Sequence, residues 1–448
     1  MKSEKELTLE SVMDLIRKRD PHQEEFRQAA SEVLQWVIPF AKSTDKYNSY
    51  ALFERLTEAE RIIQFRVPWV TDDGISMTNR GYRVQFNSAL GPYKGGLRFH
   101  PDVNLSILKF LAFEQTFKNS LTGLPLGGGK GGADFNPKGR SNSEIMGFCQ
   151  SFMTELHRHI GPATDIPAGD IGVGSAEIGY MFGQYKRLSN TFNGVLTGKG
   201  NSFGGSLLRP EATGFGLLYF VEEMINTAGD QTKDMTVLIS GSGNVAQHSC
   251  MKAIEMGMKV LTMSDSDGYI YVKGGITEEQ LESVMELKNE KKGRISECTD
   301  LFDCEYHEGT PWSVEATLAL PCATQNELNE KDAKRLVDNG LKYLAEGANM
   351  PCTDKAAAYL IENGIRFVPG KAANAGGVSV SGLEMTQNAM RIKWDADRVD
   401  KELRNIMHQI HEQCTTYGQD GENINYEKGA AIAGFITVAD AMIAQGGV

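Results

Sequence analysis

Paired cysteines, long apolar runs and an excess of positive charge are all missing from this sequence. Its seven cysteines are odd in number, scattered and never spaced as C-x-x-C, so neither a disulfide framework nor a zinc site is predicted. The net charge of −12 argues against a nucleic-acid or anionic-membrane partner. An anionic small molecule would therefore have to be bound by a local cluster of Lys or Arg side chains.

Apolar stretches are equally restricted. The N-terminal residues are charged throughout and lack the apolar core of a signal peptide, so we expect none. The most apolar stretch, residues 429–444, is short for a bilayer span and contains Asp440, so it predicts a buried helix. Together with the scattered cysteines, these features predict a cytoplasmic protein with no membrane partner and no bound metal.

A chain of 448 residues with ordinary globular composition predicts two or three domains. In the first half, helical spacing of apolar residues predicts helices over residues 5–56, 104–121 and 141–160. Asn104 precedes the second of these and is a suitable N-cap. These helices imply an α/β domain if strands lie between them.

Strand signals do lie between them. Thr57 and Glu60 fit a capping box, and the apolar residues of 62–70 and 82–86 alternate as in a β-hairpin. The glycine-rich region 125–205 shows little periodicity, which indicates long irregular loops of functional importance.

After about residue 210 the pattern changes to short apolar strands that alternate with helices. The predicted strands are "MTVLIS", "MKVLTMSD", "TLALP", "KYLAEG" and "IRFVPG". Such alternation predicts a doubly wound parallel sheet, so the second half is expected to be Rossmann-like and the whole chain a two-domain α/β protein.

The stretch "GSGNVA" opens a helix directly after the first of these strands and matches G-x-G-x-x-A. In a dinucleotide site, Gly241 would permit the tight turn, Gly243 the approach of the pyrophosphate, and Ala246 close packing of helix on strand. The next strand ends at Asp265, 24 residues after Gly241, which strengthens the prediction.

The residues alone leave the choice of dinucleotide open. Asp265 could bind a ribose 2′-hydroxyl, which favours NAD(H). Ser264 and Ser266, with Lys288 and Arg294 further on, could instead bind a 2′-phosphate, which favours NADP(H).

A lysine among five glycines, in "PLGGGKGGADF", is the other unusual pattern. A phosphate-binding P-loop would need glycine at 124 and Ser or Thr at 131, where this chain has Leu124 and Gly131. The glycines could instead bring backbone close to a ligand and leave Lys130 in a water-poor pocket. Burial and neighbouring cations would lower the pKa of Lys130 and make it a usable base near neutral pH.

Taken together and in this order, "PYKGGLRFHP", "FEQTFKNSLTGLPLGGGKGGADF", "IPAGDIGVG", "GSGNVA" and "NAGGVSVSGLEM" resemble the hexameric glutamate dehydrogenases. The resemblance covers nearly the whole chain. It implies a reversible, NAD(P)(H)-dependent reductive amination of 2-oxoglutarate with ammonia to L-glutamate, with direct hydride transfer at the nicotinamide, and a homohexameric assembly.

The resemblance also implies roles for individual residues. It makes Lys130 the catalytic lysine and Asp170 the proton-transfer carboxylate. The positions that match substrate-binding residues are Lys94 and Ser381 for the distal carboxylate, and Gln115, Lys118 and Gly169 for the α-carboxylate and its surroundings. For Ser381, N-capping of a helix explains a serine equally well.

For the cofactor, "SDS" at 264–266 with Lys288 and Arg294 is similar to the NADP-using members, so NADP(H) is favoured, and NAD(H) or the use of both cofactors is the alternative. The matching positions are Thr213, Gly241, Gly243, Asn244, Val245, Asp265, Ser266, Lys288, Arg294 and Asn374.

The competing activity is that of a leucine or phenylalanine dehydrogenase, which shares the glycine-lysine stretch and the Rossmann half. Such an enzyme binds an apolar side chain, and burying the charged Lys94 next to that side chain would cost considerable free energy. Lys94 therefore favours the diacid. By resemblance, we expect a substrate and oligomerisation domain over 1–201, a dinucleotide domain over 202–427, and a C-terminal helix over 428–448 that packs on the first domain.

Overall fold

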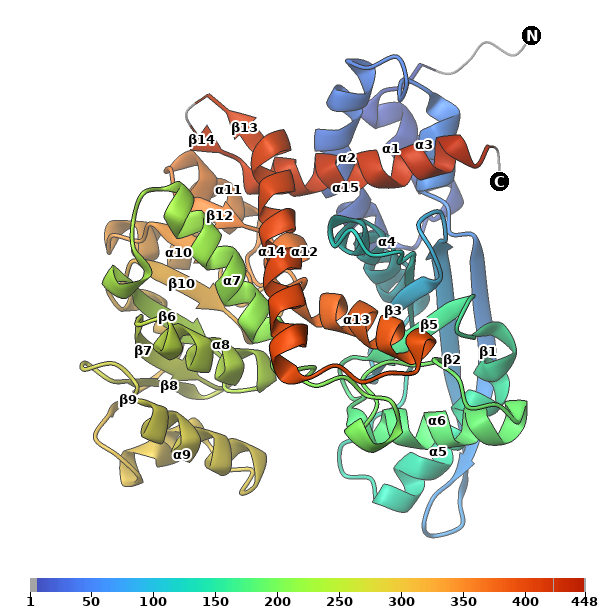
Figure 1. Cartoon of the computed structure of the whole chain (residues 1–448), viewed down its shortest axis with the longest axis horizontal. Coiled ribbons are helices and arrows are strands. Elements are labelled where there is room, and N and C mark those ends of the chain that lie inside the picture. The colour runs from blue at the N-terminus through green and yellow to red at the C-terminus, as the bar shows by residue number, and fades with distance from the viewer. Residues whose placement is uncertain (1–5, 422, 447–448) are drawn as a thin grey trace. The chain divides into compact units, whose positions relative to one another are not determined.

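The computed structural model describes residues 6–421 and 423–446, and the chain forms two compact units (Figure 1). Unit 1 comprises the residues up to Leu207, Val380–Val399 and those from Ala431 onward, and unit 2 comprises Leu208–Ser379 and Asp400–Ala430. The division differs from the expected boundaries because residues 380–399, expected in the dinucleotide domain, belong to unit 1.

Unit 1 contains a mixed five-stranded sheet in the order β1-β2-β4-β3-β5. Its strands are β1 (Arg61–Val70), β2 (Ser76–Asn87), β3 (Tyr93–Phe99), β4 (Gly128–Ala133) and β5 (Asp165–Gly169). The predicted hairpin is confirmed, because β1 and β2 are antiparallel, and β2 continues antiparallel to β4. Strand β3 lies between β4 and β5 and is parallel to both.

The helices of unit 1 pack on this sheet. They are α1 (Leu9–Arg19), α2 (Glu24–Lys42), α3 (Tyr50–Leu56), α4 (Leu105–Leu121), α5 (Asn142–Leu156) and α6 (Ser175–Ser189). Helix α4 lies against β2 and β4 and is backed by α2, while α5 packs against β1 and α6. Edge-to-face aromatic pairs join these layers, such as Phe26 with Phe113, whose ring centroids are 5.7 Å apart.

Two local capping predictions had different outcomes. Asn104 caps α4 as predicted, because its side-chain oxygen accepts a hydrogen bond from the Ile107 N–H at 2.9 Å. The capping box at Thr57 is wrong, because Thr57 ends α3 and its hydroxyl donates to the Phe53 carbonyl. The apolar residues that follow Thr57 alternate with a period of two and enter β1, so no helix starts there.

The helix predicted over 141–160 is confirmed as α5, but the expectation of long irregular loops in the rest of 125–205 is wrong, since it contains β4, β5 and α6. The glycine-lysine stretch itself is the buried strand β4. A Cβ on Gly131 would lie 2.7 Å from the Tyr82 carbonyl oxygen, and one on Gly128 would lie 2.0 Å from Thr116 Oγ1. These glycines therefore allow neighbouring segments to approach closely, and they do not indicate flexibility.

Unit 2 contains a seven-stranded sheet in the order β12-β11-β10-β6-β7-β8-β9. The strands are β6 (Thr236–Ser240), β7 (Lys259–Ser264), β8 (Gly268–Tyr271), β9 (Glu305–Glu308), β10 (Leu318–Pro321), β11 (Tyr343–Ala345) and β12 (Arg366–Val368). The first five in the spatial order are parallel, which confirms all five predicted strands and the Rossmann-like sheet. The antiparallel pair β8 and β9, which completes the edge, was not predicted.

Helices precede or follow most of these strands. They are α7 (Ala212–Thr227), α8 (Asn244–Glu255), α9 (Glu278–Asn289), α10 (Glu330–Asp338), α11 (Asp354–Glu362), α12 (Gly370–Ala373), α13 (Gly376–Met390) and α14 (Ala396–Gly418). A small hairpin of β13 (Gln419–Asp420) and β14 (Asn423–Ile424) precedes α15 (Tyr426–Ala444). Helix α13 begins in unit 2 and continues in unit 1.

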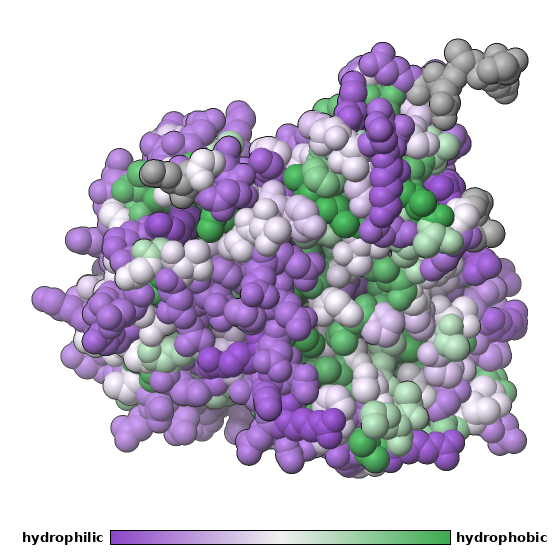
Figure 2. Space-filling view, turned by 45° about the horizontal axis from the view of Figure 1, so that its top comes forward, coloured by the Kyte–Doolittle hydropathy of each residue, from purple (hydrophilic) through white to green (hydrophobic). Residues whose placement is uncertain are grey.

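Helix α15 contains the most apolar stretch of the chain, and its unit 1 part is buried as predicted. Phe435 stacks on Phe53 of α3 at a centroid distance of 5.5 Å and meets Tyr47 edge-on at 5.3 Å. Within the described ranges, no helix is long and apolar enough to span a membrane. Hydrophilic residues cover much of the surface visible in Figure 2, with apolar residues in smaller patches.

Candidate active site

Lys130, the lysine among glycines, lies at the centre of a cluster of charges in unit 1. Its position on β4 buries it, leaving 4% of the residue exposed. Its Nζ is 3.0 Å from Oδ2 of Asp170, which directly follows β5. Burial lowers the pKa of Lys130, the nearby Asp170 carboxylate partly opposes this, and the Arg98 cation lowers the pKa further.

Asp170 is held by a second cation that sequence reasoning did not single out. Arg98 of β3 donates from Nε to the same Oδ2, at 2.8 Å. Burial alone would raise the pKa of Asp170, but Lys130 and Arg98 outweigh it and bring the pKa to about 2. Asp170 is therefore ionised at neutral pH. Arg98 lies four residues after Lys94 in the same motif, "PYKGGLRFHP", so a second cation in this short strand was the available signal.

A fully buried ion pair, also missed from sequence, lies behind Lys130. Arg83 of β2 binds Asp165 of β5 through two hydrogen bonds, and both side chains are completely buried. Arg83 also donates to the Gly95 carbonyl of β3, and Gln85 donates to Asp165. Because β2, β3 and β5 are thereby joined, this pair fixes the strands that surround the lysine.

Lys94 of β3 is the most deeply buried of the predicted substrate-binding cations, with 1% of the residue exposed. Its Nζ lies 2.8 Å from the hydroxyl oxygen of Thr197, a fully buried residue that sequence reasoning missed. Ser381 is buried inside α13 and lies in unit 1. Because Ser381 is inside this helix, the alternative that it is an N-cap is wrong.

Gln115 and Lys118 lie one turn apart on α4, and both are half-buried. The Gln115 amide donates to Asn119 Oδ1 at 2.6 Å, and Asn119 in turn donates to the Lys94 carbonyl at 3.1 Å. This chain of hydrogen bonds ties the helix that carries Gln115 and Lys118 to the strand that carries Lys94.

Gly169 ends β5 directly before Asp170 and lies opposite Leu97 of β3. A Cβ at this position would be 2.4 Å from the Val173 carbonyl oxygen, so only glycine fits the tight turn that follows. The structure thus gathers Lys94, Lys130 and Gly169 on three adjacent strands, with Asp170 directly after the last of them, and α4 packs against β4 and β3.

The predicted dinucleotide turn lies in unit 2, between β6 and α8. Gly241 has φ +84, a value that favours glycine, and its N–H donates to the Ser264 hydroxyl at 2.7 Å. Gly243 and Asn244, at the N-terminus of α8, are exposed, and a Cβ on Gly243 would meet open space. Val245 follows half-buried and Ala246 is fully buried, as the motif predicts.

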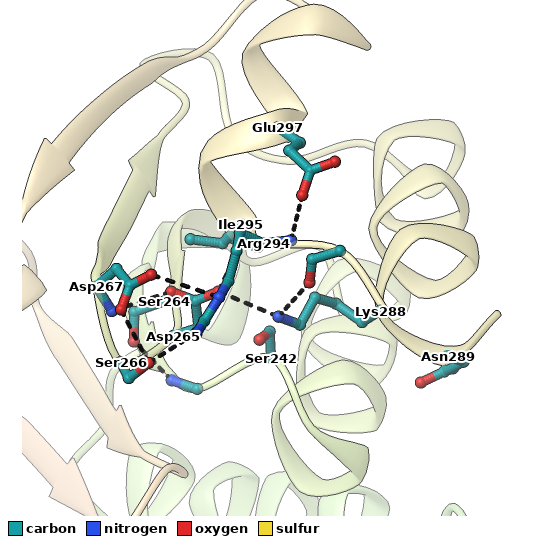
Figure 3. A network of polar contacts seen from close by, with 12 residues as sticks. Ser242, Ser264, Asp265, Ser266, Asp267, Lys288, Asn289, Arg294, Ile295 and Glu297 are labelled. Carbon is teal, nitrogen blue, oxygen red and sulfur yellow. Dashed lines mark hydrogen bonds and ion pairs between the residues drawn. The ribbon is translucent and has the colours of Figure 1, made fainter. Parts of the chain in front are cut away.

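Asp265 lies at the end of β7 in a network of polar contacts (Figure 3). Its Oδ2 accepts from Lys288 Nζ at 3.1 Å and from the Ile295 N–H at 2.8 Å. Burial would raise the pKa of Asp265, but these bonds and one from the Asp267 N–H hold it below its usual range. The carboxylate of Asp265 is thus already occupied by donors from its own chain.

Arg294 and Ser266 lie beside this carboxylate. Arg294 Nη1 donates to the Ser266 hydroxyl at 2.9 Å, and Arg294 Nε is 3.4 Å from Asp267 Oδ2 (Figure 3). The side chain of Arg294 is 56% exposed, so it is accessible to an anionic ligand group. Serine hydroxyl, guanidinium and the Lys288 ammonium are together suited to a phosphate.

Thr213 and Asn374 lie elsewhere in unit 2. Thr213 is on the first turn of α7, and its hydroxyl oxygen would be 2.5 Å from a Cβ on Gly377. The Asn374 amide donates to the carbonyls of Gly347 and Ala348 and to Asn349 Oδ1. Asn374 therefore holds the loop after β11, at the carboxyl end of the parallel sheet where ligands of such folds bind.

These residues fit a dinucleotide phosphate. The open space at Gly243 lets a pyrophosphate approach, and the N–H groups at the exposed N-terminus of α8 can donate to it. The exposed Arg294 next to Ser266 can donate to a ribose phosphate. The described residues contain no group of His, Cys, Asp and Glu side chains able to hold a metal ion.

Comparisons with known proteins agree over nearly the whole length. The family described as Glutamate/Leucine/Phenylalanine/Valine dehydrogenase matches residues 204–446, and the Glu/Leu/Phe/Val dehydrogenase dimerisation domain matches residues 59–187. The NADP-specific glutamate dehydrogenases of Salmonella typhimurium strain LT2 and of Escherichia coli strain K12 are each 56% identical to this chain, with 98% of both chains covered. That of Giardia intestinalis is 57% identical, over 98% of this chain and 99% of its own.

Solved structures give the same result. A Plasmodium falciparum glutamate dehydrogenase superimposes with a TM-score of 0.96 at 52% identity, covering 98% of this chain and 94% of its own. Its likeness extends over both units.

Proposed function

Because the chain belongs to the Glutamate/Leucine/Phenylalanine/Valine dehydrogenase family, we propose that it is an NADP(H)-dependent glutamate dehydrogenase. It interconverts 2-oxoglutarate and ammonia with L-glutamate, as an oxidoreductase acting on a CH–NH2 group. The observation that carries the choice of substrate is the burial of Lys94 in unit 1. A buried ammonium suits the distal carboxylate of a diacid, because a carboxylate can accept a charge-assisted hydrogen bond from it and an apolar substrate side chain cannot.

The substrate has one carboxylate at each end, and the cations of unit 1 are assigned accordingly. Lys94 and Ser381 bind the distal carboxylate, with the Thr197 hydroxyl beside Lys94. Lys118 and Gln115 bind the α-carboxylate from one face of α4, and the backbone of Gly169 borders the reacting carbon. The burial of these groups supports the assignment, because electrostatic contacts are stronger where water is excluded.

Lys130 and Asp170 divide the proton transfers. Burial lowers the pKa of Lys130 and so eases the loss of its proton, which supports Lys130 as the base that acts on the attacking water and polarises the developing oxygen. Asp170 transfers protons to and from the substrate amine, and its contacts with Lys130 and Arg98 return it to the ionised form, as its pKa of about 2 indicates. When bound, NADP(H) supplies or accepts the hydride.

Unit 2 provides the residues that would hold NADP(H). Gly241, Gly243, Asn244 and Val245 form the pyrophosphate turn. Ser266, Arg294 and Lys288 bind the 2′-phosphate, since Asp265 is occupied by Lys288 and backbone N–H groups rather than open to a ribose hydroxyl. Thr213 and Asn374 border the nicotinamide amide.

A two-by-two assay tests this function. Oxidation of NADPH and of NADH is followed separately, with ammonium and either 2-oxoglutarate or 2-oxoisocaproate. We expect the highest kcat/KM with NADPH and 2-oxoglutarate. A preference for the branched monoacid would overturn the assignment of Lys94, and a preference for NADH would overturn that of Ser266 and Arg294.

The assembly proposed is a cytoplasmic homohexamer. The match of residues 59–187 to a dimerisation domain and the resemblance to hexameric family members support it. Light scattering after size-exclusion chromatography should give six times the chain mass of 49.2 kDa. A mass of one or two chains at micromolar concentration would contradict it.

A further inference from the structure

A second buried ammonium–carboxylate pair lies in unit 1, formed by Lys199 and Glu384. Lys199 Nζ is 2.8 Å from Glu384 Oε1, and the two side chains are 1% and 0% exposed. Neither residue has a part in the proton transfers or carboxylate contacts proposed above. Burying two charges costs free energy unless their hydrogen-bonding capacity is well used, so the partners of this pair indicate what it does.

Glu384 uses its carboxylate to hold a short buried loop. Its Oε2 accepts from the Gly198 N–H at 2.9 Å, and its Oε1 accepts from the Lys199 N–H at 3.4 Å. Lys199 Nζ also donates to the Leu196 carbonyl, which closes the loop on itself. One carboxylate therefore organises the backbone of residues 196–199.

The backbone of this loop is conformationally demanding. Leu196 has φ 62 and Gly198 has φ +82, and a leucine in the left-handed region is strained. Between them, the Thr197 N–H donates to the Pro167 carbonyl of β5 at 2.9 Å. This conformation directs the Thr197 hydroxyl to within 2.8 Å of Lys94 Nζ. The ion pair thus maintains a strained loop, and this loop places the Thr197 hydroxyl against the substrate-binding Lys94.

The same carboxylate is attached to the helix that carries Ser381. Glu384 and Ser381 are three residues apart on α13, so they lie on neighbouring positions of one helical face. Glu384 therefore connects the element bearing Ser381 to the loop bearing Thr197. The distance between the two hydroxyl groups and their relation to Lys94 depend on this connection.

We propose that the Lys199–Glu384 pair is a positioning device that sets selectivity for the distal carboxylate of the substrate. It acts through Thr197, Lys94 and Ser381 and touches neither substrate nor cofactor. This inference rests on the proposed function, because it takes the diacid as the substrate. Loss of the pair relaxes the loop and weakens binding of the distal carboxylate, while the proton chemistry at Lys130 and Asp170 continues.

The test uses Lys199→Met and Glu384→Gln in the full-length protein. For each we would measure kcat and KM with NADPH, ammonium and either 2-oxoglutarate or the monocarboxylic 2-oxobutyrate, and the melting temperature. The matched control is Lys109→Met, which breaks a third buried lysine–carboxylate pair of unit 1, Lys109 with Asp20 at 2.7 Å. Lys109 and Asp20 are 2% and 9% exposed, so the loss of stability should be comparable.

We expect both site variants to lose about tenfold or more in kcat/KM for 2-oxoglutarate, mainly through KM, with little change for 2-oxobutyrate. The ratio of the two substrates should stay at the wild-type value in Lys109→Met. An unchanged ratio in the site variants, or an equal change in the control, would overturn the inference and leave the glutamate dehydrogenase assignment standing. A wild-type protein without activity on 2-oxoglutarate would overturn both.

If a single variant fails to fold, the double variant Lys199→Met/Glu384→Gln keeps the test decisive, because it leaves no unpaired buried charge. It should melt at a higher temperature than either single variant while its substrate ratio stays reduced. Recovery of the wild-type ratio in the double variant would overturn the inference.

Discussion

Lys130 Nζ lies 3.0 Å from Asp170 Oδ2, and it shares that oxygen with the guanidinium of Arg98. These contacts affect the pKa values of both Lys130 and Asp170. Burial and Arg98 lower the pKa of Lys130, while the Lys130 and Arg98 cations hold the pKa of Asp170 below its usual range. A lysine whose proton is easily lost and an ionised carboxylate thus lie within hydrogen-bonding distance, which suits the movement of protons in both directions of a reversible amination.

Lys130→Ala should retain the fold and the binding of 2-oxoglutarate but lose turnover. The side chain supplies proton transfer and charge stabilisation, so kcat should fall by about 10²–10⁴-fold. Steady-state kinetics and equilibrium binding of 2-oxoglutarate would measure the two effects separately. Activity within a few-fold of wild type would show that Lys130 is not the base.

Arg98→Met should shift the pH dependence of the reaction. Because the Arg98 cation lowers the pKa of Lys130, its removal raises that pKa, and the rise of kcat/KM with pH moves to higher pH. A pH–rate profile from pH 6 to about 10 measures the shift. Arg66→Met, at an exposed position of β1, is the control and should leave the profile unchanged. A profile that stays in place or moves to lower pH would contradict the role of Arg98.

Arg294→Ala should reduce kcat/KM for NADPH by about tenfold or more and leave that for NADH within about twofold. A charge-assisted bond from guanidinium to phosphate is lost only with the phosphorylated cofactor. Lys291→Met removes an exposed cation of the same segment, paired with Glu286, and serves as the control. Equal losses with both cofactors would place Arg294 outside the 2′-phosphate site.

Glu346 should make stability depend on pH near neutrality. Burial raises its pKa to about 7, although the N–H groups of Gly370 and Cys352 donate to it. The folded protein therefore binds this proton more tightly than the unfolded chain, so the stabilisation is complete below about pH 4.5 and is lost as pH rises through 7. The free energy of unfolding should fall by an amount on the order of 3 kcal/mol across this window.

Denaturant unfolding at several pH values, with Glu346→Gln as the reference, measures this contribution. The variant cannot ionise, so its unfolding free energy should lack this component of the pH dependence. Parallel curves for the two proteins between pH 4.5 and 7 would show that Glu346 ionises in the folded state as it does in the unfolded chain.

The fold could be predicted where its signals are local. The strand–turn–helix around Gly241 and the parallel strands of unit 2 depend on patterns within a few residues, and they are present as predicted. In the glycine-lysine stretch, Lys130 is buried as predicted, but the backbone is a strand where a loop was expected. Its glycines resemble a loop in sequence, yet they serve as contact surfaces for strands and a helix that come from elsewhere in the chain.

The missed members of the candidate site share a different cause. Arg83 meets Asp165 across 82 residues, and Lys199 meets Glu384 across 185. Nothing near any of these side chains distinguishes a buried charge from a solvated one, because the compensating partner lies far away in the chain. Thr197 was missed for the same reason, since its partner Lys94 is 103 residues distant.

The glycines of β4 have a consequence for anyone who would transplant this chemistry. The atoms around Gly128 and Gly131 leave no room for even a methyl group, so the strand is held by close contact with its neighbours. The position of the Lys130 ammonium thus depends on how closely the neighbouring segments approach β4. A designer who copied only the lysine and the aspartate onto another scaffold would reproduce the two side chains but not the packing that sets the distance between them.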